Sequence, residues 1–151
     1  PHRWRLNLRT GETREEPLSD RVMEFGMVNA QVYGHDYRYA YNMTAEPGMF
    51  LFDGLVKHDL RTGCDERYAF GEGVYGSETP FAPRPGATAE DDGYLVTFTT
   101  DMVRDRSECL VFDAASITDG PIARVRLPER ISSGTHSCWT PAAALPGSSA
   151  G

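Results

Sequence analysis

Hydrophobic and polar residues alternate in short runs along this chain, and turn residues separate the runs. In "DDGYLVTFTT" an Asp-Gly pair predicts a turn, and residues 94–100 predict a strand rich in β-forming side chains. The next segment predicts strands at 108–113 and 122–127, joined by a loop that closes on a second Asp-Gly pair. No window of a dozen residues has apolar side chains at helical spacing. The pattern therefore predicts an all-β chain of antiparallel meanders.

A short motif repeats along the chain. "WRLNLRTGE" (4–12) resembles "LVKHDLRTGC" (55–64), and their Thr-Gly pairs lie 52 residues apart. A looser copy, "LVFDAASITDG", places an Asp-Gly pair 57 residues further on. A period near fifty residues with about four strands per unit is typical of a β-propeller blade. The alternative is three unrelated hairpins with common turn chemistry.

Three blades cannot close a ring. The missing blades would come either from partner chains or from a longer protein of which this chain is the C-terminal part. We favour the longer protein, because the chain opens on Pro1 rather than on methionine.

Composition narrows the function classes. The 15 basic and 22 acidic residues give a net charge of −7, which without a basic stripe argues against nucleic-acid binding. The three cysteines are far apart and form no Cys-x-x-Cys motif, so neither a zinc cage nor a disulfide framework is indicated. This favours a reducing, cytoplasmic setting. The longest apolar stretch, "GMFLF", is too short to span a bilayer.

One of the four histidines stands out. We expect His2 and His58 to be solvated and His35 to lie in a turn. His136, in "GTHSCW", has small neighbours that would let the imidazole point into a crowded centre. The alternative for His136 is an ordinary histidine that is hydrogen-bonded to backbone.

Two glutamates have apolar neighbours. Glu24 lies in "RVMEFGMVN", and Glu78 lies in a Pro/Gly-rich segment beside Phe81. If these carboxylates point inward, a nearby cation or an imidazole N–H would compensate the cost of burial. Alternation could instead place both on outer strand faces. The acidic run at 90–92 is expected to be a solvated turn.

The ordered blocks of this sequence resemble the C-terminal end of the carotenoid cleavage oxygenase family, which includes apocarotenoid and lignostilbene oxygenases and the vertebrate retinoid isomerase. The similarity lies in "SETPFAPRPGATAEDDGYLVTF", in "LVFDAASITDGPIARVRLPERISSGTHSCW", in "RVMEFGMVNAQVYGHDYRYAYNM" and in "GLVKHDLRTG". It implies that residues 1–140 are the C-terminal blades of a seven-bladed β-propeller. Residues 141–151 are expected to form a disordered tail.

The resemblance also implies a metal centre. In the family, four histidines hold one iron(II) ion on the propeller axis, and glutamates hydrogen-bond to those histidines. His136 matches the last iron ligand, and Glu24 and Glu78 match two of the glutamates. Phe81 and Trp139 are candidates for apolar tunnel walls, although ordinary core packing would explain each of them equally well. His2, His35 and His58 do not match the other ligand positions, so this chain alone is expected to be iron-free and inactive.

The implied activity is oxidative cleavage of one C=C bond by O2. The substrate would be a small apolar conjugated molecule: a carotenoid, an apocarotenoid or a stilbene. A peripheral membrane contact, made by segments upstream of this chain, stays open at this point. Two alternatives remain at this point: a non-enzymatic propeller that binds other molecules, and a propeller hydrolase that uses Glu24 and Glu78 as an acid/base pair about 5–10 Å apart.

Overall fold

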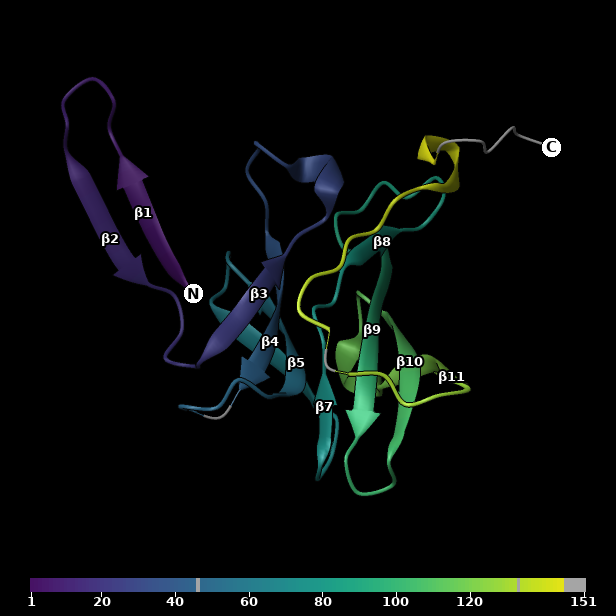
Figure 1. Cartoon of the computed structure of the whole chain (residues 1–151). Coiled ribbons are helices and arrows are strands. Elements are labelled where there is room, and N and C mark those ends of the chain that lie inside the picture. The colour runs from purple at the N-terminus through teal and green to yellow at the C-terminus, as the bar shows by residue number, and fades with distance from the viewer. Residues whose placement is uncertain (46, 133, 146–151) are drawn as a thin grey trace.

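Antiparallel strands are the main regular elements of the computed structural model, which describes residues 1–45, 47–132 and 134–145. Three short 3-10 helices are the other regular elements of the described part, and turns and loops make up the rest (Figure 1). In chain order the elements are β1 (His2–Leu6), β2 (Thr13–Pro17), β3 (Met23–Met27), η1 (Ala30–Val32), β4 (Tyr39–Ala45), β5 (Phe52–Asp59), β6 (Cys64–Ala69), β7 (Val74–Gly76), β8 (Phe81–Pro83), β9 (Gly93–Asp101), β10 (Arg106–Asp113), η2 (Ile117–Asp119), β11 (Pro121–Arg126) and η3 (Ala142–Ala144).

The larger sheet consists of two blades. In the first blade, β3, β4, β5 and β6 pair in chain order, and every pair is antiparallel. In the second blade, β7 and β8 pair with different ends of β9, and β10 and β11 follow. A single bridge between Phe52 and Gly76 links the two blades. The predicted all-β meander is confirmed. The innermost strand of the first blade is β3, and β7 and β8 together take this position in the second blade.

The sequence repeat corresponds to a repeated turn between the two outer strands of a blade. The backbone carbonyls of Asn7 and Asp59 each accept a 2.8 Å hydrogen bond from the N–H of a glycine four residues later, Gly11 or Gly63. These two glycines have φ values of 75° and 73°, a left-handed conformation that glycine adopts without steric cost. In the looser copy the connection is η2, which is followed by Gly120 with φ 84°. The β1–β2 hairpin therefore corresponds to the outer pair β5–β6, and it stands apart from the larger sheet (Figure 1).

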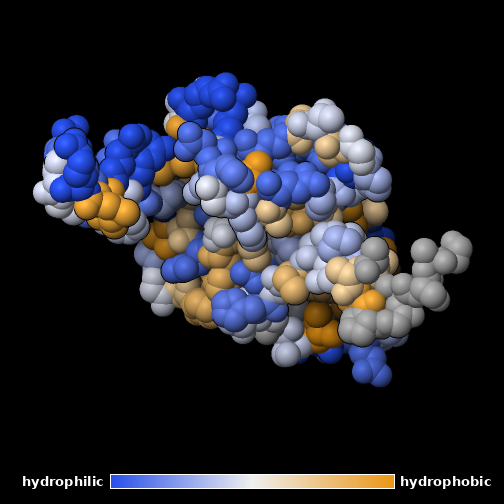
Figure 2. Space-filling view, turned by 90° about the horizontal axis from the view of Figure 1, so that it is seen from above, coloured by the Kyte–Doolittle hydropathy of each residue, from blue (hydrophilic) through white to orange (hydrophobic). Residues whose placement is uncertain are grey.

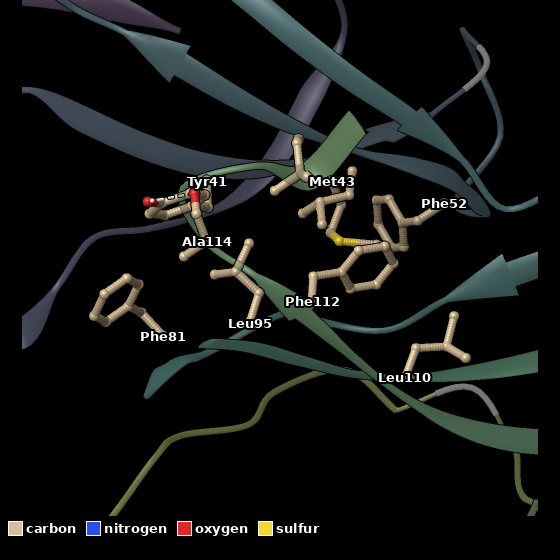
Figure 3. Close-up of a cluster of buried hydrophobic side chains, with 10 residues drawn as sticks. Tyr41, Met43, Phe52, Phe81, Leu95, Leu110, Phe112 and Ala114 are labelled. Atoms are coloured by element: carbon tan, nitrogen blue, oxygen red, sulfur yellow. Dashed lines mark hydrogen bonds between the residues drawn. The ribbon is translucent and has the colours of Figure 1, made fainter. Parts of the chain in front are cut away.

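The hydrophobic core lies between the two blades. Side chains from β4 and β5 meet side chains from β9 and β10 (Figure 3). Buried and less buried positions alternate along most of β9. Burying one large apolar side chain contributes about 1.5–3 kcal/mol, so the facing blades stabilise one another. The core consists of Tyr41, Met43, Phe52, Leu55, Phe81, Leu95, Leu110, Phe112, Ala114 and Ile117.

The outer surface is mixed. Seen from above, hydrophobic side chains form separate patches between hydrophilic ones (Figure 2). Within the described ranges, no helix has the length and apolar character needed to cross a bilayer. Of the tail predicted at 141–151, Ala142–Ala144 forms η3, and residues 146–151 lie outside the described part of the chain.

Acid should weaken an ion pair at the end of β5. The Arg38 guanidinium contacts Asp59 through two hydrogen bonds, of 2.7 and 3.1 Å, and this pairing lowers the pKa of Asp59 below its ordinary value of 3.8. The stabilisation is therefore fully present above about pH 4, and it is lost as pH falls through the lower folded-state pKa. We expect the urea midpoint of the wild type to fall more steeply below pH 4 than that of Asp59→Asn. Asp105→Asn, which alters an exposed carboxylate, should follow the wild type.

Candidate functional site

The innermost strand of each blade is irregular at its glutamate. From Glu24 to Met27, β3 takes three residue steps against two on β4, which is a one-residue bulge. The ladder along β9 shows the same excess: five steps from Gly76 to Phe81 face four steps on β9. The extra residue there separates β7 from β8 and leaves Glu78 in the gap. Bulges re-aim side chains, so both glutamates lie where the regular strand alternation is interrupted.

Phe25 occupies the bulge of β3 in an uncommon backbone conformation. Its φ is 54°, in the left-handed region, which costs a residue with a Cβ about 1–2 kcal/mol. Its ring packs against Phe52 with centroids 5.0 Å apart, and Phe52 belongs to the core. The ring also contacts His136 in an edge-on arrangement, with centroids 5.4 Å apart and an interplanar angle of 80°. The strained residue therefore connects the core to the candidate metal ligand.

Glu78 is buried and holds the C-terminal segment against the second blade. The backbone N–H of Ser137 donates to Glu78 Oε2 over 2.5 Å, and the Ser137 hydroxyl donates to the Glu78 carbonyl over 3.2 Å. Hydrogen bonds that involve a charged carboxylate are stronger than neutral ones. Residues 134–139 form no regular element, so these two bonds fix their path between β3 and β8 (Figure 1).

His136 is thereby placed next to Glu78. Its Nδ1 lies 3.6 Å from Glu78 Oε2, slightly beyond hydrogen-bonding distance, and its side chain is 76% exposed. A carboxylate next to Nδ1 favours the tautomer whose Nε2 is free to bind a metal. The donor set therefore fits an imidazole ligand of an iron ion, although it supplies only one ligand. The histidine predicted from sequence and one of its two glutamates do lie together.

Glu24 does not contact this pair. Its side chain is exposed, and in the described ranges no hydrogen bond or ion pair joins it to Glu78 or His136. Its register position nevertheless faces Met43, whose sulfur accepts a 2.9 Å hydrogen bond from Thr79, the residue after Glu78. Each glutamate lies at the irregular innermost strand of its blade, and a role for Glu24 at the metal remains a prediction.

The two candidate tunnel residues lie in different surroundings. Phe81 is 5% exposed and stacks on Tyr41 with ring centroids 5.7 Å apart, inside the core. Trp139 is half exposed and follows the His136 segment. Core packing accounts for Phe81, whereas contact of Trp139 with a substrate remains a prediction.

The remaining histidines lie outside the His136 segment, on or beside other elements. His2 is exposed, as expected, and His35 lies in an exposed bend after η1. The expectation that His58 is solvated was wrong: it is 1% exposed, and its Nδ1 lies 2.5 Å from Asp65 Oδ1. The reason is that β5 lies between β4 and β6, with nearly all its side chains buried. Across the described ranges, no three His, Cys, Asp or Glu side chains come together in a way that could hold a metal ion.

Sequence reasoning missed two residues of this site. Ser137 follows His136 directly and precedes Trp139 by two positions, which could have drawn attention to it. Its hydrogen bond to Glu78, however, joins positions 59 residues apart, and no local pattern indicates this. Phe25 follows Glu24 directly, but nothing in the sequence marks a left-handed phenylalanine.

Comparison with known proteins supports this description. The family model described as "Retinal pigment epithelial membrane protein" matches residues 1–141. The carotenoid cleavage oxygenase of Mycobacterium tuberculosis is 34% identical over 145 residues, which cover 92% of this chain and 28% of that protein.

Solved structures agree with the sequence match. A mutant of the Synechocystis apocarotenoid oxygenase superposes with a TM-score of 0.87 at 30% identity, covering 92% of this chain and 29% of that one. The lignostilbene dioxygenase of Pseudomonas brassicacearum superposes with a TM-score of 0.86 at 29% identity, covering 93% of this chain and 32% of that one. This chain spans less than a third of the length of each of these relatives. With its outer hairpin, its two blades and a matching family model over nearly all its length, the chain belongs to the retinal pigment epithelial membrane protein family of seven-bladed β-propellers.

Proposed function

We propose that the protein is a non-haem iron(II)-dependent dioxygenase that cleaves one C=C bond of a carotenoid, apocarotenoid or stilbene. Addition of O2 across the broken double bond gives two carbonyl products, one oxygen atom in each. The observation that carries the proposal is the His136–Glu78 pair at the innermost side of the blades. Relatives that are named as carotenoid and lignostilbene oxygenases support the reaction class.

In this proposal each residue of the pair has one task. His136 holds the iron through Nε2, and Glu78 accepts from Nδ1–H, which fixes the ring and raises its basicity. Ser137 holds the carboxylate of Glu78 through its backbone N–H. The iron, when bound, supplies the activation of O2. Three further histidine ligands would come from segments other than residues 1–151.

The surroundings suit an apolar substrate and a reducing compartment. Phe25, Phe50 and Phe52 form an aromatic cluster beside His136, and such side chains bind conjugated apolar molecules well. The three cysteines are free, which agrees with the proposed cytoplasmic location.

The test is to produce the natural full-length protein that contains this chain in the presence of ferrous iron. We expect about one iron per chain, and cleavage of either a lignostilbene or an apocarotenal to aldehydes with consumption of O2. His136→Ala should lose both the iron and the cleavage. An iron-loaded wild type that cleaves neither substrate, or a His136→Ala protein that keeps its activity, would contradict the proposal.

A further inference from the structure

Among the described residues, one polar and one aromatic side chain contact the His136 ring. It belongs to an irregular segment, and its side chain is 76% exposed. The polar contact is Glu78 Oε2 at 3.6 Å from Nδ1, which is too long to fix the plane of the ring on its own. The second contact is the edge-on Phe25 ring. A ligand whose orientation depends on two contacts should be sensitive to the loss of either one.

The Phe25 ring is itself held in place by its neighbours, so it can fix the orientation of the His136 ring. Its ring is braced from behind by Phe52, which is 2% exposed, and from the side by Phe50 at 6.0 Å and 83°. Its left-handed φ, inside the bulge of β3, sets the direction of the ring. Glycine would adopt this φ without strain but would remove the ring contact. Backbone strain of this kind persists where the surrounding structure holds it, and it clusters at functional sites.

We propose that Phe25 is a positioning residue: its ring holds the imidazole of His136 in the orientation that presents Nε2 to the metal. The role of the metal rests on the proposed function, whereas the ring-to-ring contact does not. Phe25 acts through His136 and needs no contact with the substrate for this task. The bulge of β3 thus directs the Phe25 ring toward His136, which lies 111 residues away in the chain.

Two measurements on the natural full-length protein test this proposal. The first is the dissociation constant for cobalt(II), which imidazole-rich sites bind more tightly than iron(II). The second is the chemical shift of the His136 ring protons in the metal-free protein, assigned by comparison with His136→Ala. The edge-on contact places these protons in the ring current of Phe25. The variants are Phe25→Leu, Phe25→Tyr and the control Phe50→Leu, which alters the same cluster but not the contact with His136.

Phe25→Leu should weaken cobalt binding by about 3- to 10-fold, the size of one aromatic contact, and should move the His136 proton shifts. Phe25→Tyr should restore both, and Phe50→Leu should leave both close to wild type. Equal cobalt affinity and equal shifts in Phe25→Leu and wild type would overturn the positioning role. So would an equal effect of Phe50→Leu, because a general loss of packing would then explain the result. A wild type that takes up no cobalt contradicts the proposed function, while the proton shifts still decide whether Phe25 positions the ring.

Discussion

Replacing Asp91 with alanine should destabilise the protein by about 3–5 kcal/mol, because the change leaves the charge of Lys57 buried without its counter-ion. The Lys57 side chain is 5% exposed and donates to Asp91 Oδ2 over 2.8 Å and to the Ala115 carbonyl over 3.1 Å. Its ammonium group also lies 4.3 Å from the centre of the Tyr39 ring. Neither the carbonyl nor the ring can replace a full negative charge. Chemical unfolding of the natural full-length protein, followed by tryptophan fluorescence, measures the loss.

Two further variants separate a buried charge from a general effect of the turn. Lys57→Met in the Asp91→Ala background should recover most of the lost stability, because no unpaired charge then remains in the core. The neighbouring Asp92 pairs with Arg84, and both side chains are 39% exposed. Asp92→Ala should therefore cost no more than about 1 kcal/mol. If Asp92→Ala costs as much as Asp91→Ala, the turn as a whole matters rather than the buried ion pair.

The acidic run at 90–92 shows where sequence reasoning reached its limit. The turn was predicted correctly, but its carboxylates are paired rather than solvated. Glu90 accepts hydrogen bonds from the backbone N–H groups of residues 38 and 39, and Asp91 neutralises Lys57. A turn is determined by local chemistry, which sequence shows. Which partners meet that turn depends on how one blade packs against the next, and no local pattern encodes this.

The same difference between local chemistry and long-range packing decides what could be predicted elsewhere in the fold. The repeated Thr-Gly turns were readable because glycine at a left-handed position leaves a mark in the sequence. The burial of His58 could not be predicted, because β5 is covered on both edges only when β6 pairs with it. At the site, His136 and Glu78 could be named from the family resemblance. The hydrogen bond from Ser137 to Glu78 and the ring contact between Phe25 and His136 could not be predicted in this way. They depend on a bulge and on long-range contacts, which do not follow from strand periodicity.

Replacing Glu78 should weaken metal binding by about 10- to 100-fold in the natural full-length protein, the usual cost of losing a carboxylate behind a histidine ligand. Two variants divide this effect between charge and position. Glu78→Gln keeps a side-chain oxygen that can accept from the Ser137 N–H, so the C-terminal segment should stay in place while the negative charge beside Nδ1 is lost. Glu78→Ala removes the charge and the acceptor together. We therefore expect the loss of cobalt(II) affinity to be larger for Glu78→Ala than for Glu78→Gln.

Hydrogen exchange at the Ser137 amide distinguishes the two contributions. Exchange should be fast only in Glu78→Ala, since only this variant leaves the amide without its carboxylate partner. Glu72→Gln, which changes an exposed carboxylate before β7, is the matched control and should alter neither affinity nor exchange. Unchanged cobalt affinity in Glu78→Ala would show that the buried carboxylate only anchors the C-terminal segment. In the structure, Glu78 Oε2 faces both the Ser137 amide and His136 Nδ1. This one oxygen therefore couples the position of the C-terminal segment to the orientation of the His136 ring, and a shift of the Ser137 amide should disturb the ring.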